Sequence, residues 1–193
     1  LAIYNQITSG GGIDADKKQR YQEIKRLIDE TCPKYGNDIY EVDMFARDVA
    51  NSYTKEVEKY KNPRGGIFQA GLYPVSANVP LGAQTGATPD GRPCGFPLGD
   101  GSGPCQGREM CGPTASILSA TKWEHHELIG GVAVNMKFSK SSLGPRSHGI
   151  MKSLVKAYML RGGFEIQINV TDKELLMKAM ENPEEYRDLV VRI

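Results

Sequence analysis

The segment TPDGRPCGFPLGDGSGPCQGREMCGP, from Thr88 to Pro113, limits the possible folds more than any other part of the chain. Its glycines and prolines interrupt helices, and no alternation of apolar residues of the kind that marks a strand runs through it. A loop of this length is uncommon in a compact domain and is usually either disordered or functional. Because Phe96, Leu98 and Met110 are interspersed with its turn residues, the segment is not of low complexity. We therefore predict an ordered path, anchored by these three side chains, across a surface that extends beyond this chain.

An amphipathic helix is predicted near the start of the chain. It is capped by Asp14 or Asp16 and runs to about Glu30. Its inner face is predicted to consist of Tyr21, Ile24, Leu27 and Ile28.

A second helix is predicted from a cap at Asn37 or Asp38 to the turn at Asn62-Pro63. Its apolar positions recur at helical spacing over about five turns. They are Val42, Phe45, Ala46, Val49, Tyr53 and Val57.

The next residues, 64–82, favour extended structure. Their strand-forming side chains are Ile67, Phe68, Leu72, Tyr73, Val75 and Val79. Pro74 and Pro80 exclude an ordinary central strand at those points, because proline donates no hydrogen bond to a ladder.

Strands and helices alternate again after the long segment, which predicts an α/β fold. LIGGVAVNMKF is a strand in which Gly130 and Gly131 allow close backbone approach. A helix follows over Ile150–Leu160, with Leu154, Val155, Tyr158 and Met159 facing inward. FEIQINV alternates, with Phe164, Ile166, Ile168 and Val170 on one face, and Thr171 or Asp172 then caps a helix to about Met180.

The chain ends on a predicted apolar strand that includes Leu189, Val190, Val191 and Ile193. Natural termini are more often polar and frayed. One interpretation is a terminal strand that docks into a sheet. The interpretation we favour is that the sequence stops just before a functional segment, and the start at Leu1 rather than Met similarly predicts a missing N-terminal part.

Charge and cysteine content exclude several classes of protein. Lys and Arg total 24 against 23 Asp and Glu, so no basic stripe suggests a nucleic-acid partner. No apolar stretch is long enough to span a membrane. A zinc site made from Cys94, Cys105, Cys111 and either His125 or His126 stays open as an alternative, although the spacing does not match the common structural sites. Free thiols in a reducing cytosol, including Cys32, are the preferred interpretation, so we expect a cytoplasmic protein.

No standard catalytic motif is present. The histidines His125, His126 and His148 do not form a recognisable nucleophile arrangement, and His125-His126 is predicted to be a solvated turn. The glycines of Gly10–Gly12 and Gly99–Gly103 lack the strand, helix and lysine that a phosphate-binding loop requires.

Six blocks of sequence, in order, resemble the C-terminal region of glycyl radical enzymes. They are YGND at Tyr35, RGGIFQAGLYPVSANVPLG at Arg64, GATPDGR at Gly86, GPTA at Gly112, NMKF at Asn135 and NPEEYRDLVVRI at Asn182. The last block is closer to the dehydratase, lyase and decarboxylase branches than to classical pyruvate formate-lyase. GFPLGDGSGPCQG departs from the usual pattern, which leaves the subfamily open.

The resemblance implies part of a ten-stranded α/β barrel of the pyruvate formate-lyase type, with a truncated glycine radical domain. Residues 1–86 would belong to the barrel and residues 87–193 to the radical domain. The radical glycine is expected just after Ile193 and the thiyl-forming cysteine upstream of Leu1, since none of the four cysteines lies in the G-C-x-E context of the family. The chain itself therefore has no expected catalytic residue and should be inactive alone.

The resemblance also implies a reaction, a cofactor and partners. The intact enzyme would carry out radical elimination or cleavage of C–C or C–X bonds in a small organic substrate during anaerobic metabolism. Its glycyl radical would be installed by an iron–sulfur activating enzyme that uses S-adenosylmethionine, and the intact protein would be a homodimer. Tyr73 matches a substrate-contacting tyrosine of glycerol-dehydratase-like members, although packing beside Pro74 is an equal alternative. A succinate-adding enzyme that forms C–C bonds, or a non-catalytic binding or scaffold homologue, is the alternative function.

Overall fold

The computed structural model describes residues 15–145 and 147–187. Two helices, α2 (Ala15–Thr31) and α3 (Tyr40–Val57), precede a short strand β1 (Gly71–Leu72) and helix α4 (Asn78–Ala83). The long segment then leads to helix α5 (Gly112–Ala120), the 3₁₀ turn η1 (His125–Glu127) and strand β2 (Gly131–Ser139). The remaining elements are η2 (Lys140–Ser142), α6 (Ser147–Leu160), β3 (Glu165–Thr171), α7 (Lys173–Glu181) and η3 (Pro183–Tyr186). The α/β prediction is confirmed.

The three strands form a parallel sheet in the order β1-β2-β3. Helix α6 connects β2 to β3 as a crossover, which parallel neighbours require. The β2–β3 pairing runs from Ala133 opposite Glu165 to Ser139 opposite Thr171. The β1–β2 pairing, in contrast, has only two steps, Gly71 with Gly131 and Leu72 with Val132.

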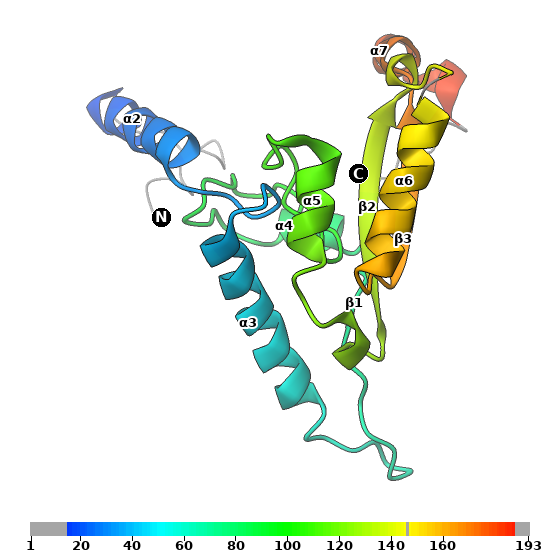
Figure 1. The fold of residues 1–193 in the computed structure, drawn as a ribbon. Coiled ribbons are helices and arrows are strands. Elements are labelled where there is room, and N and C mark those ends of the chain that lie inside the picture. Colours follow the sequence, from blue (N-terminus) through cyan, green and yellow to red (C-terminus); the bar gives the residue numbers. More distant parts are fainter. Residues whose placement is uncertain (1–14, 146, 188–193) are drawn as a thin grey trace.

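An apolar core lies between α5, β2 and α6. Its buried members are Ile117, Ala120, Val134, Met136, Leu154 and Tyr158, with Phe138 and Ile166 packed against them. Figure 1 shows α5 between α3 and the layer formed by α6 and the sheet. A smaller cluster of Ala70, Leu128 and Val132 joins the two sides of the β1–β2 pair, with Val57 and Leu72 at its margin. The predicted inward positions Leu154 and Tyr158 of α6 are therefore confirmed, whereas Met159 is exposed.

Close backbone approach at Gly130 is also confirmed. A Cβ atom on Gly130 would lie 2.6 Å from the carbonyl oxygen of Ala70, too close for any side chain. The cap of α7 is Asp172, whose carboxylate accepts hydrogen bonds from the backbone N–H groups of Glu174 and Leu175. Of the alternating apolar residues, Ile166 packs against the core, whereas Phe164, just before β3, and Val170, within it, are about half exposed.

The predicted inner faces of both N-terminal helices are largely exposed within this chain, although Val57 at the end of α3 packs against an apolar cluster. Helix α2 buries none of its residues. On α3 the predicted apolar residues Phe45, Val49 and Tyr53 are exposed, and the buried residues are Asp43, Ala50 and Thr54. The physical reason is that α3 contacts α5 through small and polar groups, while its apolar face is turned away from the described residues.

Two local predictions also failed. Helix α3 begins at Tyr40 after Ile39, with no side-chain cap, because Asn37 and Asp38 bond to distant residues instead. Val79 lies in α4 rather than in a strand; Pro80 fits there because it occupies the first helical turn, where no backbone donor is needed.

The predicted terminal strand, Leu189 to Ile193, and the glycines Gly10 to Gly12 lie outside the described residues. Within residues 15–145 and 147–187, no helix is long and apolar enough to cross a membrane.

The solvated-turn prediction was wrong for His125, which is only 2% exposed, whereas His126 is exposed. The His125 Nε2 atom lies 2.7 Å from the carbonyl oxygen of Ala120, and the ring contacts Tyr158 edge-on. Its Nδ1 atom is buried and has no hydrogen-bond partner among the described residues. Burial lowers the pKa of His125 below its ordinary 6.5, and the Ala120 carbonyl only partly offsets this.

This lowered pKa makes the region around His125 sensitive to acid. As pH falls below 6.5, the unfolded chain binds a proton that the folded chain resists, so stability is lost on acidification. We expect amides of α5 and η1 in the intact protein to exchange faster with deuterium at about pH 5.5 than at about pH 7.5, after correction for intrinsic rates. His125→Gln, which keeps a donor for Ala120, should remove much of that difference. The same acid sensitivity in both proteins would contradict this role.

Candidate functional site

The candidate site lies along one edge of β2. Strand β1 pairs with this edge only as far as Leu72, opposite Val132. The chain leaves the sheet at Tyr73-Pro74, and beyond that point the glycine-rich part of the long segment pairs with β2 instead. Gly101 forms an isolated antiparallel bridge with Val134, and the Ser102 N–H donates to the carbonyl oxygen of Ala133 at 3.0 Å. Ser102 is fully buried. The residues GDGSG therefore serve as a partner for β2.

Only glycine fits at the centre of this contact. Gly101 has φ of +64°, and a Cβ atom there would lie 2.1 Å from the carbonyl oxygen of Ala133. That backbone atom cannot move without breaking the β2 edge. The close approach explains why this part of the segment carries almost no side chains.

Arg92 fixes the first half of the segment. Its side chain is almost fully buried, and its guanidinium donates to the carbonyl oxygens of Phe96 at 2.6 Å, Pro93 at 3.1 Å and Gly86. These bonds hold the turns from Thr85 to Phe96 in one conformation. The ordered path is thus confirmed, but two of the predicted anchors were wrong: Phe96 is 54% and Met110 82% exposed.

A second set of contacts, here called the polar seam, joins the segment and α5 to residues before β1. Its hydrogen bonds and ion pairs are Asp29–Arg108, Tyr35–Ser102, Asn37–Arg108, Asn37–Met110, Asn37–Cys111, Asp38–Ser119, Asp38–Lys122, Asp43–Ser119, Asp43–Lys122 and Asn51–Glu124. The Asn37 side chain alone accepts from the N–H groups of Met110 and Cys111 and donates to the carbonyl oxygen of Arg108. Every contact in this set is polar.

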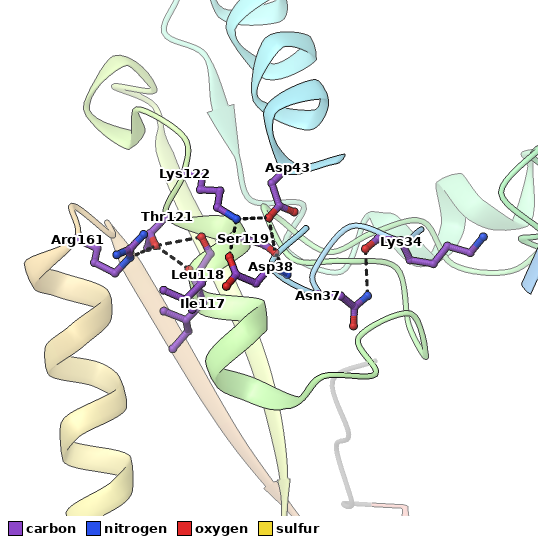
Figure 2. A network of polar contacts seen from close by, with 10 residues as sticks. All are labelled: Lys34, Asn37, Asp38, Asp43, Ile117, Leu118, Ser119, Thr121, Lys122 and Arg161. Atoms are coloured by element: carbon purple, nitrogen blue, oxygen red, sulfur yellow. Dashed lines mark hydrogen bonds and ion pairs between the residues drawn. The ribbon is translucent and has the colours of Figure 1, made fainter. Parts of the chain in front are cut away.

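Lys122 lies at the centre of the polar seam, between two carboxylates (Figure 2). Its Nζ atom is 2.5 Å from Asp38 Oδ1 and 2.7 Å from Asp43 Oδ2. The Ser119 hydroxyl donates to the same Asp43 oxygen at 3.0 Å and accepts from the Asp38 N–H. Burial opposes the charge on Lys122, but the bonds and charges of Asp38 and Asp43 outweigh it and raise the pKa of Lys122.

Tyr73 follows directly after β1, where the carboxyl ends of parallel strands commonly carry ligand sites. Its ring lies over the glycines of the β1–β2 pair: a Cβ atom on Gly71 would be 2.5 Å from the ring, and one on Gly131 would be 3.4 Å away. The side chain is about half exposed. Val75 and Ser76 then adopt positive φ angles of +47° and +70°. For a β-branched residue such as Val75 this conformation is strained, and strain of this kind concentrates at functional sites.

A cleft of about 460 Å³ separates the long segment from β2. Polar side chains that line it include Asp100, Gln106, Glu109, Ser116, Asn135 and Lys137. Asn135 donates to Asp100 at 2.8 Å, which adds a side-chain bond to the backbone contact between the segment and β2.

The cysteines do not form a metal or nucleophile site in the described parts of the chain. No group of three or more His, Cys, Asp or Glu side chains there could hold a metal ion, so the zinc alternative has no support in residues 15–145 and 147–187. All four cysteines are free thiols, and burial raises the pKa of Cys105, which disfavours its thiolate.

Sequence reasoning missed Asp43, Ser119 and Lys122. A signal was present in α3, where Asp43 shares one face with the small residues Ala50 and Thr54. The apolar residues at helical spacing on α3 formed a stronger pattern, and the prediction followed that pattern instead.

Gly101 and Gly107 allow a matched test of the contact with β2. Both have positive φ, but only at Gly101 would an added Cβ meet another atom within 4 Å. Alanine at Gly107 should cost about 1 kcal/mol in backbone strain, and alanine at Gly101 a further 1–3 kcal/mol, roughly, because a backbone group must move. We expect deuterium exchange of peptides covering 98–105 in the intact protein to increase much more for Gly101→Ala. Equal effects of the two substitutions would contradict the contact.

Two protein families match this chain, in two blocks separated by residues 83–97. Residues 12–82 match the family described as Pyruvate formate lyase-like, and residues 98–193 match the family described as Glycine radical. Trans-4-hydroxy-L-proline dehydratase of Clostridioides difficile is 36% identical over 174 residues, covering 90% of this chain and 22% of that protein.

Solved structures match as well. A structure from Roseburia inulinivorans concerned with 1,2-propanediol dehydration has a TM-score of 0.89 at 47% identity and covers 98% of this chain and 24% of that one. The B12-independent glycerol dehydratase of Clostridium butyricum, in its glycerol-bound form, has a TM-score of 0.83 at 42% identity, covering 99% and 26%. The chain thus spans about a quarter of the length of these relatives.

Proposed function

Because the chain belongs to the glycyl radical enzyme family, we propose that it is part of an enzyme that eliminates water from a small hydroxylated substrate by radical chemistry. The observation that carries this proposal is the match along nearly the whole chain to trans-4-hydroxy-L-proline dehydratase at 36% identity, and to a structure concerned with 1,2-propanediol dehydration at 47% identity and a TM-score of 0.89. Substrates of the size of propanediol, glycerol or hydroxyproline form the class we propose.

The reacting groups are proposed to lie outside the chain. We place the stored radical on a glycine shortly after Ile193 and the thiyl radical on a cysteine before Leu1. A thiyl radical takes a hydrogen atom from substrate carbon, a neighbouring hydroxyl leaves as water with a proton that the hydroxyl or amine group on the radical carbon gives up, and the thiol then returns the hydrogen atom and becomes the thiyl radical again. The cysteine is therefore regenerated, and the net change is loss of one water molecule.

The residues of this chain are proposed to bind the substrate and to position the segment that carries the radical. A phenol at Tyr73 would donate a hydrogen bond to, or accept one from, a substrate hydroxyl. Strand β2 and its GDGSG partner would form the platform for the segment that carries the radical. We place the boundary between the barrel part and the radical domain between residues 86 and 87, which fits the two blocks of family similarity.

The intact protein is proposed to work in the cytoplasm of a cell in anaerobic metabolism. Its partners would be a second copy of itself and an iron–sulfur activating enzyme that uses S-adenosylmethionine to remove one glycine hydrogen. A glycyl radical persists only where dioxygen and water are excluded, so its loop must be enclosed.

Electron spin resonance tests this proposal. The intact protein, activated without oxygen by an activating enzyme that works on a dehydratase relative, should give a glycyl doublet and then convert propane-1,2-diol, glycerol or trans-4-hydroxy-L-proline to a dehydrated product. No doublet, with the relative activated in parallel as a positive control, would refute the radical function.

Tyr73→Phe tests the role of the phenol in substrate binding. Loss of one hydrogen bond to substrate should lower kcat/KM by about tenfold or more, while the number of spins per chain stays the same. Tyr53→Phe, on the exposed face of α3, is the control. Unchanged kcat/KM in Tyr73→Phe would leave Tyr73 as a packing residue.

A further inference from the structure

The polar seam joins α3 and the residues just before it to the part of the chain that matches the Glycine radical family. Residues 98–187 have an apolar core of their own, made by α5, β2 and α6. That core does not include α3, which faces α5 with Asp43, Ala50 and Thr54. Val57 at the end of α3 packs against the cluster that contains Leu128 and Val132, and the Tyr35 ring lies 5.5 Å from the Trp123 ring. Hydrogen bonds and charges supply the attraction at the start of α3, around Asp38 and Asp43.

Lys122 supplies one of the two cations of the polar seam, and Arg108, paired with Asp29, supplies the other. The Lys122 Nζ atom bonds to Asp38 and Asp43 together, and within residues 15–145 and 147–187 no other ion pair of either carboxylate is found. The Asp43 side chain is fully buried, and its second oxygen, Oδ1, has no hydrogen-bond partner among the described residues. Without Lys122, a buried carboxylate would keep only the Ser119 hydroxyl.

The location of Lys122 links this contact to α5. It lies two residues after Ala120, the last residue of α5, and the intervening Thr121 hydroxyl accepts a bond from Arg161, the first residue after α6 (Figure 2). A displacement at Lys122 would therefore be transmitted to α5 and α6, which pack on the same strand, β2.

We propose that Lys122 is a positioning residue that holds the glycine-radical part of the protein against α3 and so fixes where the radical segment lies. It touches neither substrate nor reacting atoms and acts through Asp38 and Asp43. This inference rests on the proposed function for its consequence in turnover, but the contact itself can be tested without any radical.

The first experiment measures deuterium exchange in the intact, unactivated protein. Lys122→Met keeps the length of the side chain but removes its charge, and we expect peptides covering 98–121 to exchange about tenfold faster or more. Lys122→Arg should stay close to the wild type. Lys140→Met is the matched control, because Lys140 is exposed and pairs only at 3.4 Å with Asp172. No increase in exchange for Lys122→Met would overturn the proposal.

The second experiment separates positioning from general stability after activation. In Lys122→Met, product formed per glycyl spin should fall about tenfold or more, while spins per chain change by less than about twofold. A fall in spins per chain with unchanged product per spin indicates a merely structural role and would overturn the proposal. If wild-type protein gives no spin signal, the proposed function fails. The exchange experiment would still show whether Lys122 holds the two parts of the chain together.

A milder variant covers the case in which Lys122→Met does not fold. Asp38→Asn removes one of the two carboxylates at the more exposed end of the contact and leaves the Asp43–Lys122 pair in place. We expect a smaller increase in exchange over the same peptides. Exchange indistinguishable from wild type in Asp38→Asn would then overturn the proposal.

Discussion

The brevity of the β1–β2 pairing is the constraint on which the rest of the structure depends. Strand β2 runs from Gly131 to Ser139, but β1 accompanies it for only two residues before Pro74 turns the chain away. A buried strand edge without partners is costly, because each unpaired backbone group loses its bond to water. Gly101 and Ser102 cover the exposed positions beside Ala133 and Val134, and the glycine-rich sequence follows from the lack of space there.

Different parts of the molecule are held together by two kinds of interaction. Apolar packing joins α5, β2 and α6, where Tyr158 is fully buried and its hydroxyl donates to the carbonyl oxygen of Glu165. Burial raises the pKa of Tyr158 to about 12, so this donor stays protonated at any physiological pH. Hydrogen bonds and charges, in contrast, join this core to α3. A polar contact can be hydrated when it opens, so it determines position with a smaller free-energy cost of separation than an apolar core would.

The sequence predicted most elements because their periodicity is local. The alternation in β3, the α6 face with Leu154 and Tyr158, and the Asp172 cap all depend on neighbours within a few residues. Burial of α3 could not be predicted in the same way. Its apolar stripe at Phe45, Val49 and Tyr53 is exposed here, and Asp43 is buried because Lys122 and Ser119 reach it from the distant helix α5. His125 was misjudged for the same reason, since its burial depends on tertiary contacts with Ala120 and Tyr158.

Under the proposed function these contacts would have a purpose, because a carbon-centred radical must be held in one place and kept from water. The most direct measurement is the effect of a water-soluble paramagnetic chelate on the glycyl signal of the intact, activated protein. A doublet whose relaxation is unaffected by the chelate is the result this account predicts, since the docked radical segment would be enclosed. A glycyl signal relaxed by the chelate as strongly as that of a solvent-exposed radical, or the lack of any glycyl signal, would contradict it.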